Sequence, residues 1–433
     1  MRERDGSGFV CIPKGYIIYN MLLYNTSQLL TLAGGPQRGR RLGELHIIEN
    51  GAVLMQDESI LAVGKSADLL AAYPDEPAFD AEGKVVLPGF VDPHTHLIWA
   101  GDRAAEFEER LQGKTYLEIL AAGGGILSTV YATRRASAAE LLAQTRQRAR
   151  TLLRYGTTTA EVKSGYGLDS DTELRQLEVL LDLNADGPLE IVPTYLGAHA
   201  IAPEFEGDPE GYTDHLCKSL LPQLADWCRQ KRLSRLPFVD VFCETGAFNL
   251  SQSRRILEAA RSLGFPLKIH ADEFDNLGGA ALAAELGAVS ADHLVKTSAA
   301  DINALAHSHT VAVALPCTPF GLAETHYTPV KEILQADGLL AIASDINPGT
   351  AWCESMQFVI ALACRYLKLT PAQAIAAATI NAAAAIDRAR HIGSLEVGKQ
   401  ADMLILSVSD YRHLGYRFGT NLVETVIKKG EIC

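Results

Sequence analysis

The sequence has no apolar run long enough to span a membrane and no excess of basic residues. The longest apolar candidate, residues 16–32, is interrupted by polar side chains, and acidic residues near the start are unlike a signal peptide. The 39 Lys and Arg residues against 52 Asp and Glu residues give a formal net charge of −13. This balance argues against nucleic acid or an anionic membrane as a partner, and we expect a cytoplasmic protein.

Cysteine is also sparse, with eight residues among 433 and no C-x-x-C pair. A disulfide framework is therefore not expected, which agrees with a reducing cytoplasm. No G-x-G-x-x-G motif follows the first strand of the central region, which weakens a dinucleotide-binding open sheet as the fold. Composition alone leaves the chemistry open.

The two ends of the chain predict strands and turns. Residues 45–48 and 52–55 flank Glu49-Asn50-Gly51, a sequence typical of a β-hairpin, and the pattern continues through 60–64. The C-terminal segment repeats the pattern at 401–406 and 423–430. We expect one small β-sandwich-like domain built from residues 1–88 and 394–433, surrounding a different domain at 89–393.

The middle of the chain alternates between short strands and amphipathic helices. Such alternation predicts a parallel sheet, and eight units in this length fit a (β/α)8 barrel, with a doubly wound open sheet as the alternative. We expect the Ala-rich stretch 374–385 to form one packed helix and Gly123-Gly124-Gly125 to lie in a mobile loop. The predicted strands are 86–92, 157–162, 190–196, 238–243, 267–271, 288–292, 311–315 and 339–344, and the clearest helices are 138–154, 171–183, 214–230, 251–263 and 277–286.

The first chemical signal is His94-Thr95-His96 at the end of the first predicted barrel strand. Residues i and i+2 of a strand point to the same side, so both imidazoles face one point, as chelation of a single metal requires. A second H-x-H, His307-Ser308-His309, lies between a predicted helix and a strand without other ligand candidates. We interpret this second pair as a solvated turn.

Three further residues stand at the ends of other predicted strands. His270 ends the fifth strand, His293 the sixth and Asp345 the eighth. The carboxyl ends of barrel strands meet at one rim, where catalytic groups of this fold lie. Any one of these histidines alone is better explained as a core residue, but the set predicts a metal site.

Imidazole and carboxylate ligands together suit zinc or iron and leave a position for water. Glu273 follows His270 by three residues and is placed to move a proton between water and a leaving group. Lys163, near the end of the second strand, is a weak candidate for bridging a second metal.

Several stretches resemble the amidohydrolase superfamily and, within it, the imidazolonepropionase family. The resemblance covers about residues 40–430 and leaves the first twenty residues outside as an apparent extension. The matching stretches are Leu87–Phe107 (LPGFVDPHTHLIWAGDRAAEF), Tyr116–Leu127 (YLEILAAGGGIL), Val162–Leu168 (VKSGYGL), Tyr195–His199 (YLGAH), Asp240–Glu244 (DVFCE), His270–Glu273 (HADE), Ser344–Gly349 (SDINPG) and Gly393–Asp402 (GSLEVGKQAD).

The resemblance implies one zinc or iron ion per subunit and a homodimer. Whether loop 112–127 closes over the site as a lid is left open. It implies the metal ligands His94, His96, His270 and Asp345. It implies substrate contacts at Arg103, Tyr166, His199, Glu273, Asn347, Gly349 and Thr350. Arg103 suits a carboxylate such as a propionate tail, although a surface ion pair with Glu106 or Glu108 is the alternative.

The implied activity is hydrolysis of the cyclic amide of 4-imidazolone-5-propanoate, a small-molecule substrate, to N-formimidoyl-L-glutamate in histidine degradation. In that reading Asp345 takes a proton from water, Glu273 delivers one to the ring nitrogen, and His293 stabilises the oxyanion. A deaminase of a cyclic amidine or nucleobase is the alternative, and it has less need for Arg103. A non-catalytic scaffold is a third possibility, against which the full ligand set argues.

Overall fold

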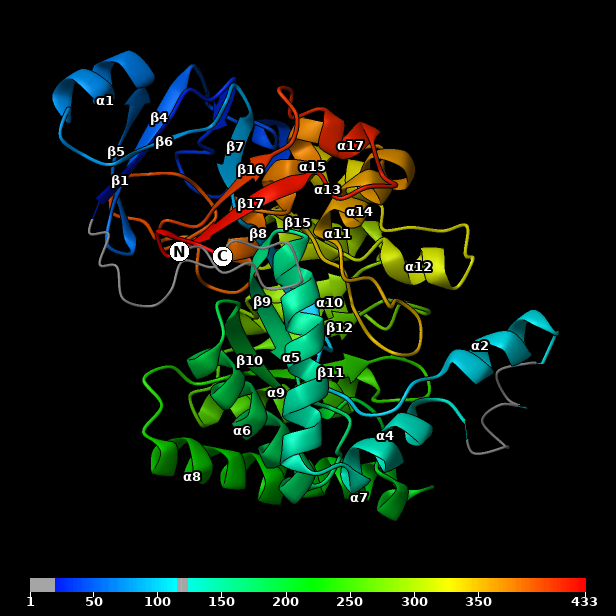
Figure 1. The fold of residues 1–433 in the computed structure, drawn as a ribbon. Helices are drawn as coiled ribbons and strands as arrows, with labels where there is room; N and C mark the ends of the chain where they lie inside the picture. Colours follow the sequence, from blue (N-terminus) through cyan, green and yellow to red (C-terminus); the bar gives the residue numbers. More distant parts are fainter. Residues whose placement is uncertain (1–19, 115–117, 119–123) are drawn as a thin grey trace.

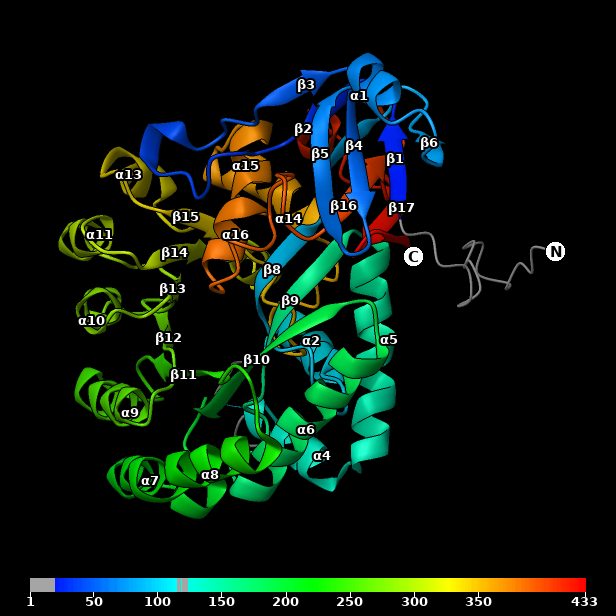
Figure 2. The ribbon, with the colours of Figure 1, turned by 90° about the vertical axis from the view of Figure 1, so that its left-hand side faces the viewer.

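A computed structural model describes residues 20–114, 118 and 124–433. Its centre is an eight-stranded parallel sheet in which each strand pairs with its neighbours in sequence order. Figures 1 and 2 show this sheet curling into a barrel. Its strands are β8 (Phe90–Thr95), β9 (Thr157–Lys163), β10 (Glu190–Ala198), β11 (Phe238–Cys243), β12 (Lys268–Ala271), β13 (Ser290–His293), β14 (Val311–Ala314) and β15 (Leu340–Ile342).

The first and last strands meet just beyond the end of β15. The Asp345 N–H donates to the His94 carbonyl at 3.1 Å, and the His96 N–H donates to the Ile346 carbonyl at 2.9 Å. These bonds join the two edges of the sheet at its carboxyl end. The predicted (β/α)8 barrel is therefore confirmed, and the open-sheet alternative is wrong.

Helices cover the outside of the barrel (Figure 2). Several begin at the capping signals that the sequence carries, such as Ser137 with Glu140 and Asn249 with Gln252, which satisfy the first free N–H groups of their helices. The main helices are α5 (Ala138–Arg154), α6 (Ser170–Asp186), α7 (Pro209–His215), α8 (Leu221–Lys231), α9 (Leu250–Ser262), α10 (Gly279–Leu286), α11 (Ala299–Ala306) and α13 (Val330–Gln335).

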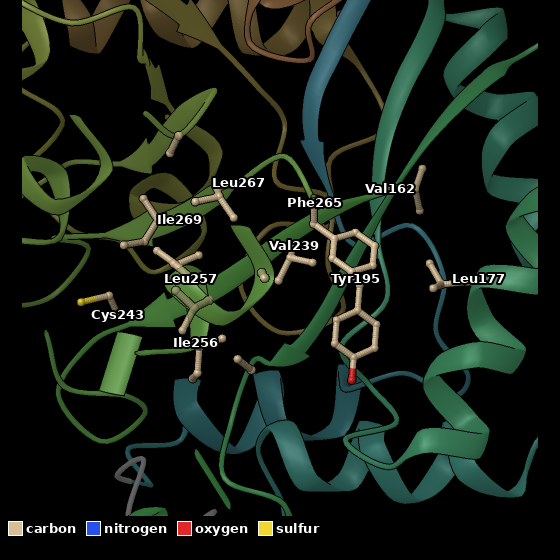
Figure 3. Packing of buried hydrophobic residues seen from close by; sticks show 14 of the residues in the cluster. Val162, Leu177, Tyr195, Val239, Cys243, Ile256, Leu257, Phe265, Leu267 and Ile269 are labelled. Atoms are coloured by element: carbon tan, nitrogen blue, oxygen red, sulfur yellow. The ribbon is translucent and has the colours of Figure 1, made fainter. Parts of the chain in front are cut away.

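The largest apolar core lies between the strands and these helices. Figure 3 shows part of this core, which includes Tyr195, Val239, Leu257 and Phe265. These side chains are almost completely buried. Burial of this kind contributes about 25 cal/mol per Å² of apolar surface and holds the helices against the sheet.

The two chain ends form two further sheets beside the barrel (Figure 1). One has the order β5-β4-β1-β6 and the other β18-β17-β16-β7-β2-β3. The strands are β1 (Asn20–Tyr24), β2 (Gln28–Leu30), β3 (Ile47–Glu49), β4 (Gly51–Gln56), β5 (Ser59–Lys65), β6 (Ala78–Asp80), β7 (Val85–Pro88), β16 (Met403–Leu406), β17 (Val423–Lys428) and β18 (Glu431–Ile432).

The predicted hairpin around Glu49-Asn50-Gly51 is wrong, because β3 and β4 belong to different sheets. β3 pairs with β2, whereas β4 pairs with β1 and β5. The Asn50 carbonyl accepts from the Ser66 N–H, so the turn is tied to the start of α1 (Ser66–Ala72) and not closed on itself. The real hairpin joins β4 and β5.

Two other element predictions also need correction. The strand predicted at 86–92 is two strands, and the chain passes from β7 to β8 at Gly89, where any side chain would collide with Thr158. The Ala-rich stretch forms two helices, α15 (Pro371–Ala377) and α16 (Ile380–Ala384), separated by the non-helical backbone of Thr379. The many alanines of this stretch favour helix throughout, so their pattern does not reveal the break.

Parts of loop 112–127 and of Gly123-Gly124-Gly125, and almost all of the first twenty residues, lie outside the described residues. The adjacent helix α2 (Ala104–Leu111) projects away from the barrel at the right of Figure 1. Among the helices at described positions, none combines the length and apolarity needed to cross a membrane.

Candidate active site

Four buried side chains converge at the carboxyl end of the barrel. The Nε2 atoms of His96 and His270 lie 3.3 Å apart. Asp345 Oδ1 lies 3.5 Å from His94 Nε2 and 3.5 Å from His96 Nε2. One ligand atom from each histidine therefore points to a common centre that Asp345 also faces, as the strand positions predict.

The opposite side of two of these imidazoles is held by a buried carboxylate. His94 Nδ1 lies 2.6 Å from Asp292 Oδ2, and His270 Nδ1 lies 3.1 Å from Asp240 Oδ2. A carboxylate only accepts, so each Nδ1 carries the proton and each Nε2 presents a lone pair to the centre. Asp345 is held in turn by the hydroxyl of Thr318, which donates to its Oδ2.

Two buried lysines neutralise these carboxylates. Lys163 Nζ lies 2.8 Å from both Glu161 Oε1 and Asp240 Oδ2, and Lys268 Nζ lies 3.5 Å from Asp292 Oδ2. The carboxylates raise the pKa of Lys163 despite its burial, so it is charged. Lys163 is thus engaged in ion pairs behind the histidines, and the weak expectation that it bridges a second metal is not supported.

Burial favours the neutral form of three of the imidazoles. Burial, together with neighbouring positive groups, holds the pKa of His94, His96 and His293 well below the usual range. A neutral imidazole is the form that binds a metal, and the buried Nε2 of His94 has no hydrogen-bond partner among the described residues. The donor set, its burial and its orphaned nitrogen fit a divalent metal ion.

Glu273 and His293 lie beside this centre. Glu273 Oε2 is 3.6 Å from His293 Nε2, and both residues are buried. Burial, with smaller contributions from Asp345 and Glu244, raises the pKa of Glu273 well above its usual value. Burial therefore favours the protonated form of Glu273, the form that can give a proton to a bound molecule.

Backbone strain marks the same rim. Asp272, His293, Leu294 and Asp345 all have positive φ angles between 54° and 79°. Non-glycine residues adopt this conformation at a cost of about 1–3 kcal/mol, and such residues cluster at functional sites. These residues lie at or just beyond the ends of β12, β13 and β15, which supply His270, His293 and Asp345.

A buried glutamate that the sequence reasoning missed anchors the Glu273 loop. Glu244 Oε2 accepts from the N–H groups of Glu273 at 3.1 Å and of Phe274 at 2.9 Å. Glu244 lay within one of the matching stretches, at the end of β11, but nothing in the sequence showed its partner. The carboxylate fixes the loop that positions the acid.

Glu173 plays the same part for the loop that carries Tyr166. Its carboxylate accepts from the N–H groups of Gly165, Gly167 and Leu168 at 2.7–3.1 Å. The Tyr166 ring is buried and its centroid lies 5.9 Å from that of His96. Tyr166 therefore forms one wall next to the histidine centre.

His199 lies against the same wall, stacked on His96 with ring centroids 4.8 Å apart. Its Nδ1 is 2.9 Å from the Gly165 carbonyl, which only accepts, so Nδ1 carries a proton. Burial and the nearby His270 lower the pKa of His199 to about 3. His199 is thus neutral and its Nε2 is an acceptor, which removes it as a source of positive charge.

Arg103 joins the rim from the loop before α2. Its Nε donates to Glu106 Oε2 at 2.8 Å, so the expected ion pair with Glu106 exists. Its terminal nitrogen packs on Gly349, where a side chain would collide with the guanidinium. Glu106 thus binds the Nε of Arg103, while the Nη1 atom reaches the rim at Gly349.

Asn347 organises the rim loop from within. Its Oδ1 accepts from the N–H groups of Gly349 and Thr350, both at 2.8 Å, and its Nδ2 donates to the Asp345 carbonyl at 2.8 Å. These bonds tie the loop to the candidate ligand Asp345. Asn347 therefore has few hydrogen-bonding positions left for a bound molecule, whereas Gly349 leaves room for Arg103.

Other sequence features lie away from the centre. His307 and His309 are exposed in the turn after α11, as expected for the second H-x-H. Six cysteines are free thiols, namely Cys217, Cys228, Cys243, Cys317, Cys353 and Cys364. The structure gives none of these six residues a place among the candidate ligands.

Comparison with known proteins places the chain in a family. Family models described as "Amidohydrolase family" match residues 244–433 and 78–115, and an "Imidazolonepropionase-like composite domain, bacteria" matches residues 51–75. The chain is 51% identical to the imidazolonepropionase of Herpetosiphon aurantiacus over 95% of this chain and 97% of the relative. It is 48% identical to the imidazolonepropionase of Chloroflexus aggregans over 95% and 98%.

Solved structures with the same fold include deaminases. Escherichia coli guanine deaminase superposes with a TM-score of 0.68 at 16% identity, covering 95% of this chain and 98% of that one. An adenosine deaminase from Xanthomonas campestris with bound zinc gives 0.68 at 19% identity, covering 95% and 92%. These similarities concern the fold alone, whereas the sequence matches are far closer. The chain therefore belongs to the imidazolonepropionase family of amidohydrolases, and it is a hydrolase.

Proposed function

We propose that this hydrolase opens the ring of 4-imidazolone-5-propanoate at its amide C–N bond, forming N-formimidoyl-L-glutamate in histidine degradation. The observation that carries the proposal is the buried centre of His94, His96, His270 and Asp345 in a chain half identical to imidazolonepropionases. The amide hydrolysed is cyclic, so both products of C–N cleavage remain in one molecule.

The four residues His94, His96, His270 and Asp345 would hold one zinc or iron ion. When bound, such an ion supplies Lewis acidity and makes hydroxide available near neutral pH. We assign to Asp345 the proton released during attack on the ring carbonyl, because its Oδ1 lies 3.5 Å from the Nε2 atoms of His94 and His96. Glu273, whose protonated form burial favours, donates to the departing ring nitrogen.

His293 completes the proton-transfer side of the site. Its Nε2 faces Glu273, so one imidazole adjoins both the acid and the centre. We assign it to stabilise the negative charge that develops on the carbonyl oxygen, a role that commonly accounts for about 10²–10³ in rate. A neutral imidazole can serve this task because its single N–H group donates a hydrogen bond.

Substrate orientation falls to the opposite wall. The Arg103 guanidinium offers its fork to the propionate, while the Nε2 of His199 accepts from a ring N–H and Tyr166 packs on the ring. Asn347, Gly349 and Thr350 shape the loop against which Arg103 packs. Arg103 therefore supplies positive charge to this wall, whereas His199 does not.

We further propose a cytoplasmic homodimer in which residues 1–88 and 394–433 form one domain and residues 89–393 the other. The free thiols support a reducing compartment, and the family resemblance supports the dimer. The mass of the native particle in solution, by light scattering, tests the dimer. A single-chain mass would contradict it.

The substrate assignment is tested by following ring opening of imidazolonepropionate, beside ammonia release from guanine. We expect turnover of the first alone; ammonia release without ring opening would instead support a deaminase. The Arg103→Gln variant should raise KM about 10–100-fold with little change in kcat, since a charged hydrogen bond contributes about 1.5–3 kcal/mol. With the propionamide analogue, whose tail is neutral, the same variant should lose almost nothing.

A further inference from the structure

A second cavity lies at the opposite end of the barrel from the histidine centre. It has a volume of about 600 Å³ and is formed by three segments that are far apart in the sequence. These are the residues just before β11, the loop that leads into β12, and the segment 387–391 that follows α16. The strands begin there, whereas the histidine centre lies where they end.

The wall of this cavity is basic. Arg235, Arg388, Arg390 and His391 line it, together with the apolar side chains of Leu236 and Phe238. The single acidic side chain in the lining is Asp387. In a chain with a net charge of −13, such a concentration of guanidinium groups in one hollow is unexpected from composition.

These three arginines have no carboxylate partner within ion-pair distance in the part of the chain that the structure describes. Arg235 donates to His391 Nε2 at 3.3 Å, and Arg388 donates to the Asp387 backbone carbonyl at 3.1 Å. Glu190, a nearby carboxylate that attracts Arg388, is already paired with Lys428 at 3.1 Å. Elsewhere on the surface, Arg254 and Arg255 do have glutamate partners.

The electrostatic consequence falls on Arg388. This side chain is partly buried, and burial together with repulsion from Arg235 lowers its pKa. Two guanidinium groups that repel each other across a hollow are stabilised when an anion binds between them. The planar fork of arginine matches the two oxygens of a carboxylate or phosphate, and this volume is ordinary for small-molecule sites.

We propose that this cavity binds a small oxyanion, carboxylate or phosphate, between Arg235 and Arg388. Arg390 and His391 provide the outer contacts, and Leu236 and Phe238 provide an apolar wall for the carbon chain of an organic acid. The inference depends on the cavity alone and is independent of the proposed reaction.

The test is calorimetric titration of the full chain with two probes, inorganic phosphate and glutarate, at ionic strength held constant with chloride. We expect at least one probe to bind saturably, with one site per chain, and Arg388→Gln to weaken that binding at least tenfold. Arg388→Lys keeps the charge but loses the planar guanidinium, so its affinity should lie between those of wild type and Arg388→Gln. Arg40→Gln, which removes an exposed arginine that does not line the cavity, should bind like wild type.

The two probes separate the sources of the oxyanion, since binding of phosphate alone, glutarate alone or both supports the site and names its ligand class. Circular dichroism checks that each variant is folded, and Arg390→Gln, at an exposed position, gives a second reduction in affinity if Arg388→Gln is unstable. The absence of saturable binding to wild type would overturn the proposal. Equal affinity in wild type and Arg388→Gln would also overturn it, because the anion would then bind elsewhere.

Discussion

The two ends of the barrel differ in how their charged side chains are paired. At the carboxyl end, the carboxylates behind the histidines are matched by lysines, as in Lys163 with Asp240 and Lys268 with Asp292. At the amino end, Arg235 and Arg388 face each other without an acidic partner in the described structure. Buried carboxylates that face buried lysines hold the histidines in place, as a preorganised catalytic centre requires. An unpaired cluster remains available for a ligand to complete.

The largest effect that this comparison predicts concerns the two H-x-H pairs. His94→Ala removes a ligand candidate at the rim, and kcat/KM for ring opening should fall by at least about 10³-fold, since metal ions supply several kcal/mol of transition-state stabilisation. His309→Ala, the matched change in the exposed pair, should leave kcat/KM and bound metal unchanged. A similar loss of kcat/KM in both variants would show that the histidines at the carboxyl end of the barrel have no particular role in catalysis.

The next effect concerns stability. Lys163→Met leaves Glu161 and Asp240 buried without their cation and should lower the free energy of unfolding by about 3–5 kcal/mol. Arg235→Gln, at an exposed position without an ion pair, should change it by no more than about 0.5 kcal/mol. Urea unfolding followed by circular dichroism measures both variants. An equal loss of unfolding free energy in both variants would contradict the idea that only the carboxyl end depends on ion pairs for stability.

A smaller effect concerns the carboxylates behind the histidines. Asp292→Asn keeps the shape but removes the charge that faces His94 Nδ1, and metal affinity should fall about 10–100-fold. Competition with a chelator measures the affinity without relying on turnover. Asp171→Asn, an exposed change on α6, is the control and should have wild-type affinity.

The smallest effect is the response of metal affinity to pH. Burial raises the pKa of Asp345 to about 6 in the apo protein, so a proton competes with the metal below that pH. Metal affinity should therefore fall about tenfold for each pH unit below about 6 through this one proton. Above pH 6 this contribution vanishes. In the Asp345→Asn variant, the remaining metal affinity should no longer fall below pH 6. If it still falls there, the proton that competes with the metal belongs to another group.

Much of the rim was predictable because strand geometry makes it local. His94 and His96 share a face by simple alternation, and His270 and Asp345 end strands that the apolar pattern had already located. The paired charges behind them were harder, since each pair joins residues on different strands, such as Lys163 with Asp240. The available signal was a charged residue inside a buried strand, as in Val239-Asp240-Val241, which demands a partner without naming it.

The amino end could not be predicted at all. Its cavity depends on how residues 235–238, 264–266 and 387–391 come together, and none of these segments carries a recognisable pattern. The same limit explains the mistaken hairpin, where Asn50-Gly51 is a sound turn signal but the turn joins two sheets. Local sequence specifies turns and strand faces, whereas long-range packing decides which strands pair.

The central claim is that one metal ion in the histidine and Asp345 centre makes the chain an imidazolone hydrolase. The most direct measurement adds zinc or ferrous iron stepwise to metal-stripped protein while recording bound metal and ring opening of imidazolonepropionate. The rate should rise in proportion to bound metal, reach its plateau at one ion per chain and stay absent in His94→Ala. Full turnover by the stripped protein, or a plateau that requires two ions per chain, would contradict the account.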